Sequence, residues 1–413
     1  MIDLALLRDK PQLISDLILR KEPTFPVDKL IQADAHARSL RMSVESLRKE
    51  KNALAALGPK SNTPENREKS IELGKKLKAN ETDLEAAEKT LQTLWLACPN
   101  IPHEELPLGN KEANKAVKVV GSKPIFTHPL KNHLELNERA GWFDMEVAAR
   151  MAGSGFVFYT SLGTKVIYAL TRLLLKNNAS FGFQPVLPPY VITEKGLYNS
   201  SNLPKFAGDY YKIEQEDLNL IPTAEVSLTN IYADKILGAD QLPLRMTAWT
   251  SCFRREAGTY GSTERGLIRI HQFEKVELYS ICEPEKSYQE LDYMVTCAEN
   301  LLQQLGLHYR ISLLATQDCS FASAKTFDIE VWLPGQDRYY EVSSCSNCTD
   351  FQARRAHIRY RKVADGKPAL AHTLNASSLA LPRLMVALME NGQQPDGSIV
   401  LPPILQQEIN ALW

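Results

Sequence analysis

The first hundred residues carry hydrophobic residues at a heptad spacing, which is typical of a coiled coil. The first run, from Asp28, has two series of core positions: Leu30, Ala37 and Val44, and Ala33, Leu40, Leu47 and Leu54. After a break at Gly58-Pro59, the second run has Leu77, Leu84 and Leu91, and Leu73, Ala87 and Leu94. Two runs of about 30 residues predict an antiparallel helical hairpin roughly 45 Å long. Asn80 is a polar residue at a core site, where it can fix the register.

The rest of the chain mixes two periodicities. Apolar residues at helical spacing predict amphipathic helices over 162–176, 288–305 and 384–390. Alternation predicts strands over 327–332 and 338–345. The prolines and polar residues between Cys98 and Lys123 predict a linker.

One alternating stretch has chemistry on its polar face. Between positions 268 and 278, one face of the predicted strand is aliphatic: Ile268, Ile270, Val276 and Leu278. The other face carries charges and rings: Arg269, His271, Phe273, Lys275 and Glu277. Arg269 and Glu277 would lie roughly 26 Å apart, about the length of ATP plus a small amino acid. A plain hairpin with cross-strand charge pairs is the alternative.

The net charge of the chain is -1, so a nucleic-acid partner would need a local basic surface. Residues 38–78 of the hairpin carry many cations: Arg38, Arg41, Arg48, Lys49, Lys51, Lys60, Arg67, Lys69, Lys75, Lys76 and Lys78. Only five acids lie among them. This composition fits a solvated coiled-coil surface as well as an arm that binds a phosphate backbone, and leaves both open.

The seven cysteines show no disulfide-framework spacing, which fits a reducing cytoplasm. Cys345 and Cys348 form a lone C-x-x-C with only His357 nearby, so we expect no structural zinc. We also expect no signal peptide and no membrane span, because the N-terminus has no cleavable apolar core and the apolar runs are short.

The stretch from Phe253 to Tyr279 resembles motif 2 of the class II aminoacyl-tRNA synthetases. It contains Phe-Arg-x-Glu, a glycine-rich loop with Gly258 and Gly261, and then Arg-x-x-x-Phe-x-x-x-Glu. The string Gly266–Glu277 resembles the seryl-tRNA synthetases specifically. The predicted helix over 162–176 and the following residues 181–191, with Pro189, together resemble motif 1, and residues 374–391 resemble motif 3. Ala376, Ser378 and Pro382 stand where many members of the class have glycines, so close backbone approach is in doubt there.

The resemblance implies an α+β chain: a coiled-coil arm, then a catalytic domain on a mostly antiparallel sheet flanked by helices. It implies a tRNA-binding domain over 1–105 with its arm at about 28–97, a linker over 106–123 and a class II catalytic domain over 124–413. The implied activity is ATP-dependent activation of L-serine and its transfer to tRNA(Ser), with tRNA(Sec) as a further acceptor. A cytoplasmic homodimer that uses Mg²⁺ is implied as well, because motif 1 forms the dimer interface in that family.

The resemblance also assigns site residues. It implies Arg254, Glu256 and Arg383 as catalytic, and ATP contacts from Arg254, Arg255, Glu256, Arg269, Ile270, Phe273, Glu341, Val342, Ser343, Ser344 and Arg383. Serine contacts are implied for Thr223, Ala224, Glu225, Arg254, Glu277 and Ser377, and magnesium ligands for Glu341 and Ser344. For tRNA we expect Arg38, Arg41, Arg48, Lys49, Lys51, Lys75, Lys76 and Lys78.

Two other classes of function remain open. A synthetase-like enzyme that loads a carrier protein would lack the arm, which this chain has. A non-catalytic scaffold built on a decayed synthetase would be expected to lose Arg254, Glu256, Glu341 or Arg383, and all four are present.

Overall fold

The computed structural model describes residues 1–56, 63–257, 266–363 and 366–413. The Gly58-Pro59 break and the loop glycines Gly258 and Gly261 lie outside these ranges. The chain divides into two compact units, Met1–Pro99 and Asn100–Trp413.

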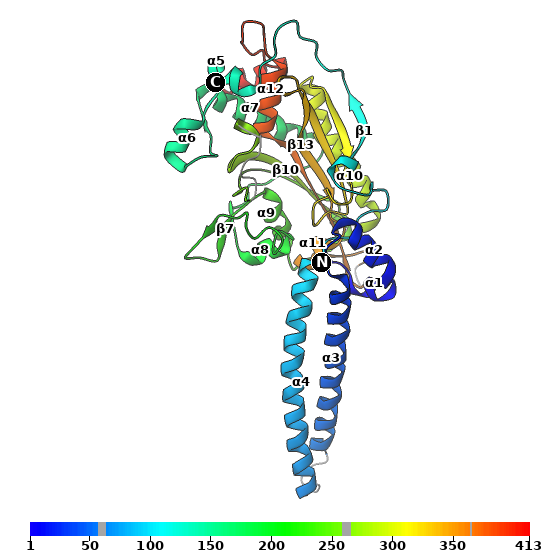
Figure 1. Ribbon diagram of the computed structural model, residues 1–413. Helices are drawn as coiled ribbons and strands as arrows, with labels where there is room; N and C mark the ends of the chain where they lie inside the picture. Colours follow the sequence, from blue (N-terminus) through cyan, green and yellow to red (C-terminus); the bar gives the residue numbers. More distant parts are fainter. Residues whose placement is uncertain (57–62, 258–265, 364–365) are drawn as a thin grey trace. The chain divides into compact units, whose positions relative to one another are not determined.

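The first unit contains the predicted helical hairpin (Figure 1). Two short helices, α1 (Leu4–Asp9) and α2 (Pro11–Lys21), precede the long pair α3 (Val27–Ala56) and α4 (Pro64–Ala97). The predicted core positions Leu30, Ala37, Val44, Leu73, Ala87 and Leu91 are buried. The heptad pattern therefore predicted the contact face of the two helices correctly.

Polar contacts fix the register of the hairpin. The Ser43 hydroxyl on α3 donates to the Asn80 side-chain oxygen on α4 at 2.9 Å. Farther along, Arg48 pairs with Glu81 at 2.7 Å. Asn80 thus makes the kind of specific cross-helix contact that was expected of a polar core residue.

The second unit is built on an eight-stranded sheet, in the order β1-β11-β12-β13-β16-β10-β9-β4. Its strands are β1 (Lys115–Val120), β4 (Gln184–Pro185), β9 (Leu244–Phe253), β10 (Gln272–Cys282), β11 (Tyr309–Leu313), β12 (Lys325–Leu333), β13 (Arg338–Asn347) and β16 (His372–Ala380). All pairs are antiparallel except β4 with β9. The expected mostly antiparallel sheet is confirmed. The stretch 106–123, expected as a linker, contains the edge strand β1, which pairs with β11.

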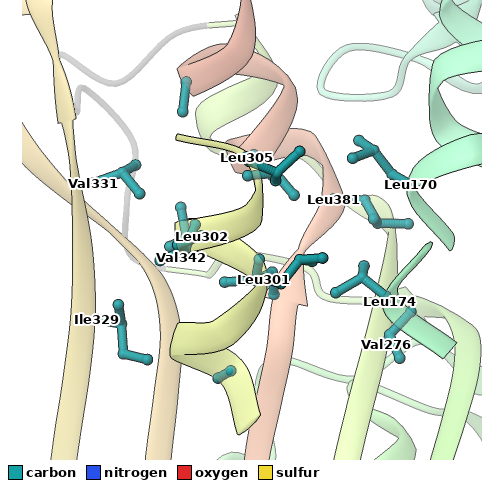
Figure 2. Packing of buried hydrophobic residues seen from close by; sticks show 14 of the residues in the cluster. Leu170, Leu174, Val276, Leu301, Leu302, Leu305, Ile329, Val331, Val342 and Leu381 are labelled. Atoms are coloured by element: carbon teal, nitrogen blue, oxygen red, sulfur yellow. The ribbon is translucent and has the colours of Figure 1, made fainter. Parts of the chain in front are cut away.

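Three helices pack on one face of this sheet: α7 (Ser161–Ser180), α10 (Ser287–Gln304) and α12 (Leu381–Asn391). Figure 2 shows their buried side chains against those of the strands, including Leu174, Leu301, Leu381, Val276 and Ile329. Val276 lies in this core, as the alternating pattern predicted. The intervening side chains of β10 therefore point to the opposite face of the sheet.

Shorter elements surround the sheet. The helices are α5 (His133–Ala140), α6 (Met145–Ala152), α8 (Glu194–Asn199), α9 (Ala224–Ile231), α11 (Phe351–Ala356) and α13 (Pro403–Leu412). The strands are β2 (Phe143–Asp144), β3 (Phe158–Tyr159), β5 (Val191–Ile192), β6 (Lys212–Ile213), β7 (Leu218–Leu220), β8 (Ile236–Gly238), β14 (Arg359–Arg361) and β15 (Ala369–Leu370). Among the described residues, these eight short strands form three small sheets beside the main one.

The predicted strand over 268–278 is wrong at its start. Gly266–Ile268 is a 3-10 turn, and β10 begins only at Gln272. Both Leu267 and Ile268 are buried in the main core. Successive residues of a strand point to opposite faces, so a strand could not bury both on the same side, whereas the turn can.

In the part of the chain that the structure describes, no helix is long and apolar enough to cross a membrane. All seven cysteines are buried and free of disulfides. The described residues contain no group of three or more His, Cys, Asp or Glu side chains arranged to hold a metal ion.

Candidate active site

The opposite face of the sheet packs in part against α9 and α11. Beside that part, the described residues form three cavities that share lining residues. The first, which we call the nucleotide cavity, is lined by Arg254, Glu256, Arg269, Ile270, Phe273 and Arg383, among others. The second, the amino-acid cavity, is lined by Thr223, Glu225, Glu277 and Asn375, among others. The third, the acidic cavity, includes Asp328 and Ser344. Arg254, Lys275 and Ser377 line both of the first two, and Glu341 lines all three.

Arg254 and Phe273 come together because β9 and β10 pair directly. The ladder pairs Phe253 with Gln272, which places Arg254 just beyond the end of the ladder. The guanidinium carbon of Arg254 lies 5.3 Å from the centre of the Phe273 ring, and its Nε donates to the carbonyl of Pro222 at 3.2 Å. The nucleotide cavity therefore offers an aromatic ring and a fixed cation side by side.

The two other arginines of the nucleotide cavity are held by carboxylates. Arg269 forms an ion pair with Glu256, whose backbone has a positive φ of 52°. Arg383, in the first turn of α12, lies 3.3 Å from the Glu341 carboxylate and donates to the Glu341 carbonyl at 3.1 Å. These contacts aim three guanidinium groups at one space, an arrangement suited to phosphates.

The acidic cavity contains the two residues expected to bind magnesium. Glu341 and Ser344 lie on β13, and the ladder places Asp328 of β12 opposite Ser344. Burial and the neighbouring Glu341 raise the pKa of Asp328. Among the described residues its buried Oδ1 has no hydrogen-bond partner. Carboxylate and hydroxyl oxygens are the donors that magnesium prefers, so Glu341 and Ser344 are of the right chemical type to hold this ion.

Three side chains of the amino-acid cavity bond one another in a closed triangle. The Lys275 ammonium lies 2.5 Å from Glu277 Oε2 and donates to Thr223 Oγ1 at 2.9 Å. The Thr223 hydroxyl donates in turn to Glu277 Oε2 at 2.8 Å. Thr223 is also the N-cap of α9, which fixes its position. The expected serine contacts Thr223 and Glu277 are thus brought together.

Glu225 lies in the first turn of α9, in the same cavity, with different partners. Its Oε1 accepts from Gln352 Nε2 at 2.6 Å and from Asn375 Nδ2 at 2.9 Å. Burial, with a further contribution from the charge of Glu277, raises the pKa of Glu225 to about 7. An approaching cation would favour the ionised form of this carboxylate.

Ser377 reaches the same site through the pairing of β10 with β16. The register places Ser377 directly opposite Glu277, so the two side chains emerge on the same face of the sheet. A hydroxyl and a carboxylate on neighbouring strands of one face suit a small polar ligand.

Four of the expected contacts lie elsewhere in the structure. The side chain of Arg255 is exposed, Ala224 and Ser343 are buried, and Val342 belongs to the hydrophobic core. Within the described residues, none of these four lines any of the three cavities. Each is a sequence neighbour of a lining residue. Val342 and Ser343 stand between the lining residues Glu341 and Ser344, where the register of β12 and β13 shifts. Simple alternation along the strand therefore does not predict which side chains of this segment reach the cavities.

The structure also adds residues that the motifs did not assign. Gln352 and Asn375 hold Glu225, and Lys275 holds Glu277. Tyr210 lines the amino-acid cavity, and among the described residues its buried hydroxyl has no hydrogen-bond partner. Only Lys275 had a signal in the sequence, because it stood on the charged face of the predicted strand.

The eight cations expected to contact tRNA are all exposed on α3 and α4. Arg41 pairs with Glu88, Arg48 with Glu81, and Lys76 with Glu72. For the other five, Arg38, Lys49, Lys51, Lys75 and Lys78, the described residues provide no ion pair. These five are therefore the most available to an anionic partner.

The antiparallel sheet and the cation-rich nucleotide cavity agree with the family models that the sequence matches. Residues 211–392 match the tRNA synthetase class II core domain (G, H, P, S and T), so the second unit contains the catalytic core of a class II aminoacyl-tRNA synthetase. Residues 1–102 match the seryl-tRNA synthetase N-terminal domain.

Relatives that match over nearly the whole chain show which family of class II synthetases this chain belongs to. The serine–tRNA ligase of Syntrophobacter fumaroxidans is 42% identical over 98% of both chains. That of Nitratidesulfovibrio vulgaris is 42% identical over 100% of this chain and 99% of its own. A solved seryl-tRNA synthetase from Pyrococcus horikoshii, complexed with ATP, superposes with a TM-score of 0.94 at 33% identity, covering 99% of this chain and 98% of that one. The chain belongs to the seryl-tRNA synthetase family.

Proposed function

We propose that this chain activates L-serine with ATP and transfers the seryl group to tRNA(Ser). The observation that carries the proposal is the order of side chains along one strand. Phe273 lies in the nucleotide cavity, Lys275 lines both cavities, and Glu277 lies in the amino-acid cavity. Family membership and the relative complexed with ATP support the same substrates.

In the first step the serine carboxylate attacks the α-phosphorus of ATP. A carboxylate oxygen bonds to phosphorus, the bond to the bridging oxygen breaks, and pyrophosphate leaves. Arg254 lines both the nucleotide and the amino-acid cavities, so its guanidinium is placed to neutralise charge where the two substrates meet. Arg269 and Arg383 would bind the departing phosphates, and Phe273 would stack on the base. Such a reaction needs positioning and charge stabilisation more than a protein nucleophile.

Magnesium would be held by Glu341 and Ser344, and when bound it would offset the negative charge of the phosphates. Glu341 suits this role because it lines all three cavities and its carboxylate is half-exposed. Its contact with Arg383 orients the carboxylate before any substrate enters.

Serine would be read by Glu225, Glu277, Thr223 and Ser377. Its ammonium group fits the ionised form of Glu225, and its hydroxyl fits the Glu277 and Ser377 pair. A site built to bond a hydroxyl rejects alanine strongly, because its own polar groups would be left unpaired.

In the second step a ribose hydroxyl at the 3′ end of the tRNA attacks the seryl carbonyl, and AMP leaves. We propose that the N-terminal domain, expected over 1–105, binds the tRNA through the arm. We propose that the catalytic domain, expected over 124–413, also includes β1, because that strand pairs with β11 of the main sheet. The five cations without ion pairs in the described residues would bind the phosphate backbone. Charging of tRNA(Sec) remains a prediction.

We also propose that the protein is a homodimer in the cytoplasm. Apolar side chains of the motif 1 region are exposed, among them Leu162, Tyr168 and Leu187, at 44%, 46% and 76%. Exposed apolar residues in one region are typical of an interface. Light scattering tests this directly, since a mass near that of one 46.4 kDa chain would exclude the dimer.

The experiment for the whole proposal is ATP–pyrophosphate exchange with a panel of amino acids, followed by charging of tRNA(Ser) and tRNA(Sec). Serine should be the substrate that drives exchange, and tRNA(Ser) should be charged. Exchange with another amino acid instead, or serine transfer to a carrier protein but not to tRNA, would contradict it. Binding of ATP without exchange would favour the non-catalytic alternative.

A further inference from the structure

Lys275 is a buried cation between the two substrate cavities. Its side chain is 7% exposed, and it contacts Glu277 at 2.5 Å and Thr223 at 2.9 Å. Burying an ammonium group is costly unless a carboxylate compensates it. The pairing commits the Glu277 carboxylate, whose side chain is 2% exposed, to an internal cation.

Unlike Glu277, Glu225 has no lysine or arginine among its hydrogen-bond partners in the described residues. Its two side-chain partners, Gln352 and Asn375, are neutral amides. Among the described residues, Glu225 forms no ion pair of its own. One cavity thus contains two carboxylates, one neutralised by the protein and one not.

Serine presents an ammonium group and a neutral hydroxyl to these two carboxylates. The ammonium is attracted to the carboxylate without a cation, and the hydroxyl needs only an acceptor without excess charge. Without Lys275, both carboxylates would attract cations, and the Glu277 end would favour an amine over a hydroxyl.

We propose that Lys275 is a specificity-positioning residue that makes the Glu277 end of the cavity select a neutral hydroxyl. It acts by neutralising Glu277 and by fixing the Thr223 hydroxyl beside it. This inference rests on the proposed serine activation and adds a reason why a side-chain amine is rejected.

The test compares serine with L-2,3-diaminopropionate, which has an amine in place of the hydroxyl, in the exchange assay. Lys275→Met should raise the KM for serine by about 100-fold. Without the lysine, the Glu277 carboxylate that bonds the serine hydroxyl is displaced and its negative charge is no longer neutralised. The KM for ATP should stay within about twofold, and the preference for diaminopropionate over serine should rise at least about tenfold, because an unpaired carboxylate attracts a cation.

Lys275→Met leaves Glu277 buried without its partner and can fail to fold, so the double variant Lys275→Met/Glu277→Gln is its matched control. It removes both charges and keeps a hydrogen-bonding group at position 277. Its preference between the two amino acids should return toward that of the wild type.

The inference is overturned if Lys275→Met leaves the preference unchanged, or if the KM for ATP rises as much as that for serine. It is also overturned if the folded double variant binds ATP but favours diaminopropionate. A wild-type protein without serine-dependent exchange would overturn the proposed function as well, whereas an active wild type with an unaltered variant preference would overturn this inference alone.

Discussion

The arm and the active site use the same kind of ion pair in opposite surroundings. Arg48 and Glu81 on the hairpin have side chains 59% and 42% exposed, whereas Lys275 and Glu277 have 7% and 2%. An exposed pair contributes about 0–1 kcal/mol and is screened by salt. Removing one partner of a buried pair costs about 3–5 kcal/mol, because the other charge is left unpaired.

The two kinds of ion pair suit two kinds of binding. The charges of the arm are numerous, hydrated and individually replaceable, which suits a phosphate backbone that is bound by their sum. The charges of the cavities are few and fixed by specific partners, which suits the discrimination of small substrates. The two regions should therefore respond very differently to single substitutions.

Arg254→Ala should cause the largest loss. Serine-dependent exchange should fall by about 10³-fold or more, because a positioned charge at the reacting phosphate is removed. Arg255→Ala is the matched control, since Arg255 is the next residue and its side chain is exposed. Its exchange rate should stay within about threefold of wild type. Equal losses in the two variants, with circular dichroism showing both folded, would contradict the geometry of the nucleotide cavity.

Replacing Arg38, Lys49, Lys51, Lys75 and Lys78 together by Gln should have an intermediate effect. The kcat/KM for tRNA charging should fall by about 10–100-fold, with a weaker salt dependence, because several phosphate contacts are lost. Exchange without tRNA should not change. Lys89→Gln, an exposed cation outside the 38–78 stretch, serves as the control. Normal charging by the fivefold variant would show that the arm does not bind tRNA through these residues.

The pH dependence of serine use should report Glu225. Its pKa is raised to about 7, and only the ionised carboxylate attracts the serine ammonium. The kcat/KM for serine should therefore fall as the pH drops below about 7, by about tenfold per unit once the carboxyl is mostly protonated. Glu225→Gln should have low activity without this acidic limb. An acidic limb that persists in Glu225→Gln would assign the titration to another group.

The same shift has a consequence for stability. Because the folded pKa lies above the ordinary value of 4.5, the native state retains a proton that the unfolded chain releases between about pH 4.5 and 7. The contribution of Glu225 to stability should therefore decrease as pH rises through that window. Relative to wild type, Glu225→Gln should gain on the order of 3 kcal/mol in unfolding free energy between pH 4.5 and 8. Urea titrations at the two pH values measure the difference.

Arg48→Ala should have the smallest effect. The exposed pair with Glu81 should contribute less than about 1 kcal/mol to the unfolding free energy of the arm. High salt should reduce that difference further. A loss of several kcal/mol in urea unfolding would mean that the pair stabilises the hairpin in a way that its exposure does not explain.

The sequence predicted the features that depend on local periodicity. The heptad residues Leu30 and Ala37 are buried, Val276 faces the helices, and Glu277 faces the cavity. The resemblance to motif 2 pointed to Arg254 and Phe273, which the β9–β10 ladder brings together. These features follow from patterns within about 30 neighbouring residues.

The remaining features depend on contacts between distant segments. Glu225 is held by Gln352 and Asn375, which lie 127 and 150 positions away. Thr223 meets Lys275 across 52 positions. The periodic pattern of hydrophobic and polar residues predicts neither of these contacts. The late start of β10 was missed because alternation alone cannot show that Leu267 and Ile268 are buried on the same side.

A crystal structure with a non-hydrolysable seryl-adenylate analogue would show directly whether the two cavities bind the nucleotide and the serine end to end. In that structure the adenine should stack on Phe273 and the phosphate mimic should contact Arg254. The seryl hydroxyl should bond to Glu277 while the seryl ammonium faces Glu225. An analogue bound with its base away from Phe273, or with its hydroxyl outside the Glu277 and Ser377 pair, would contradict this arrangement.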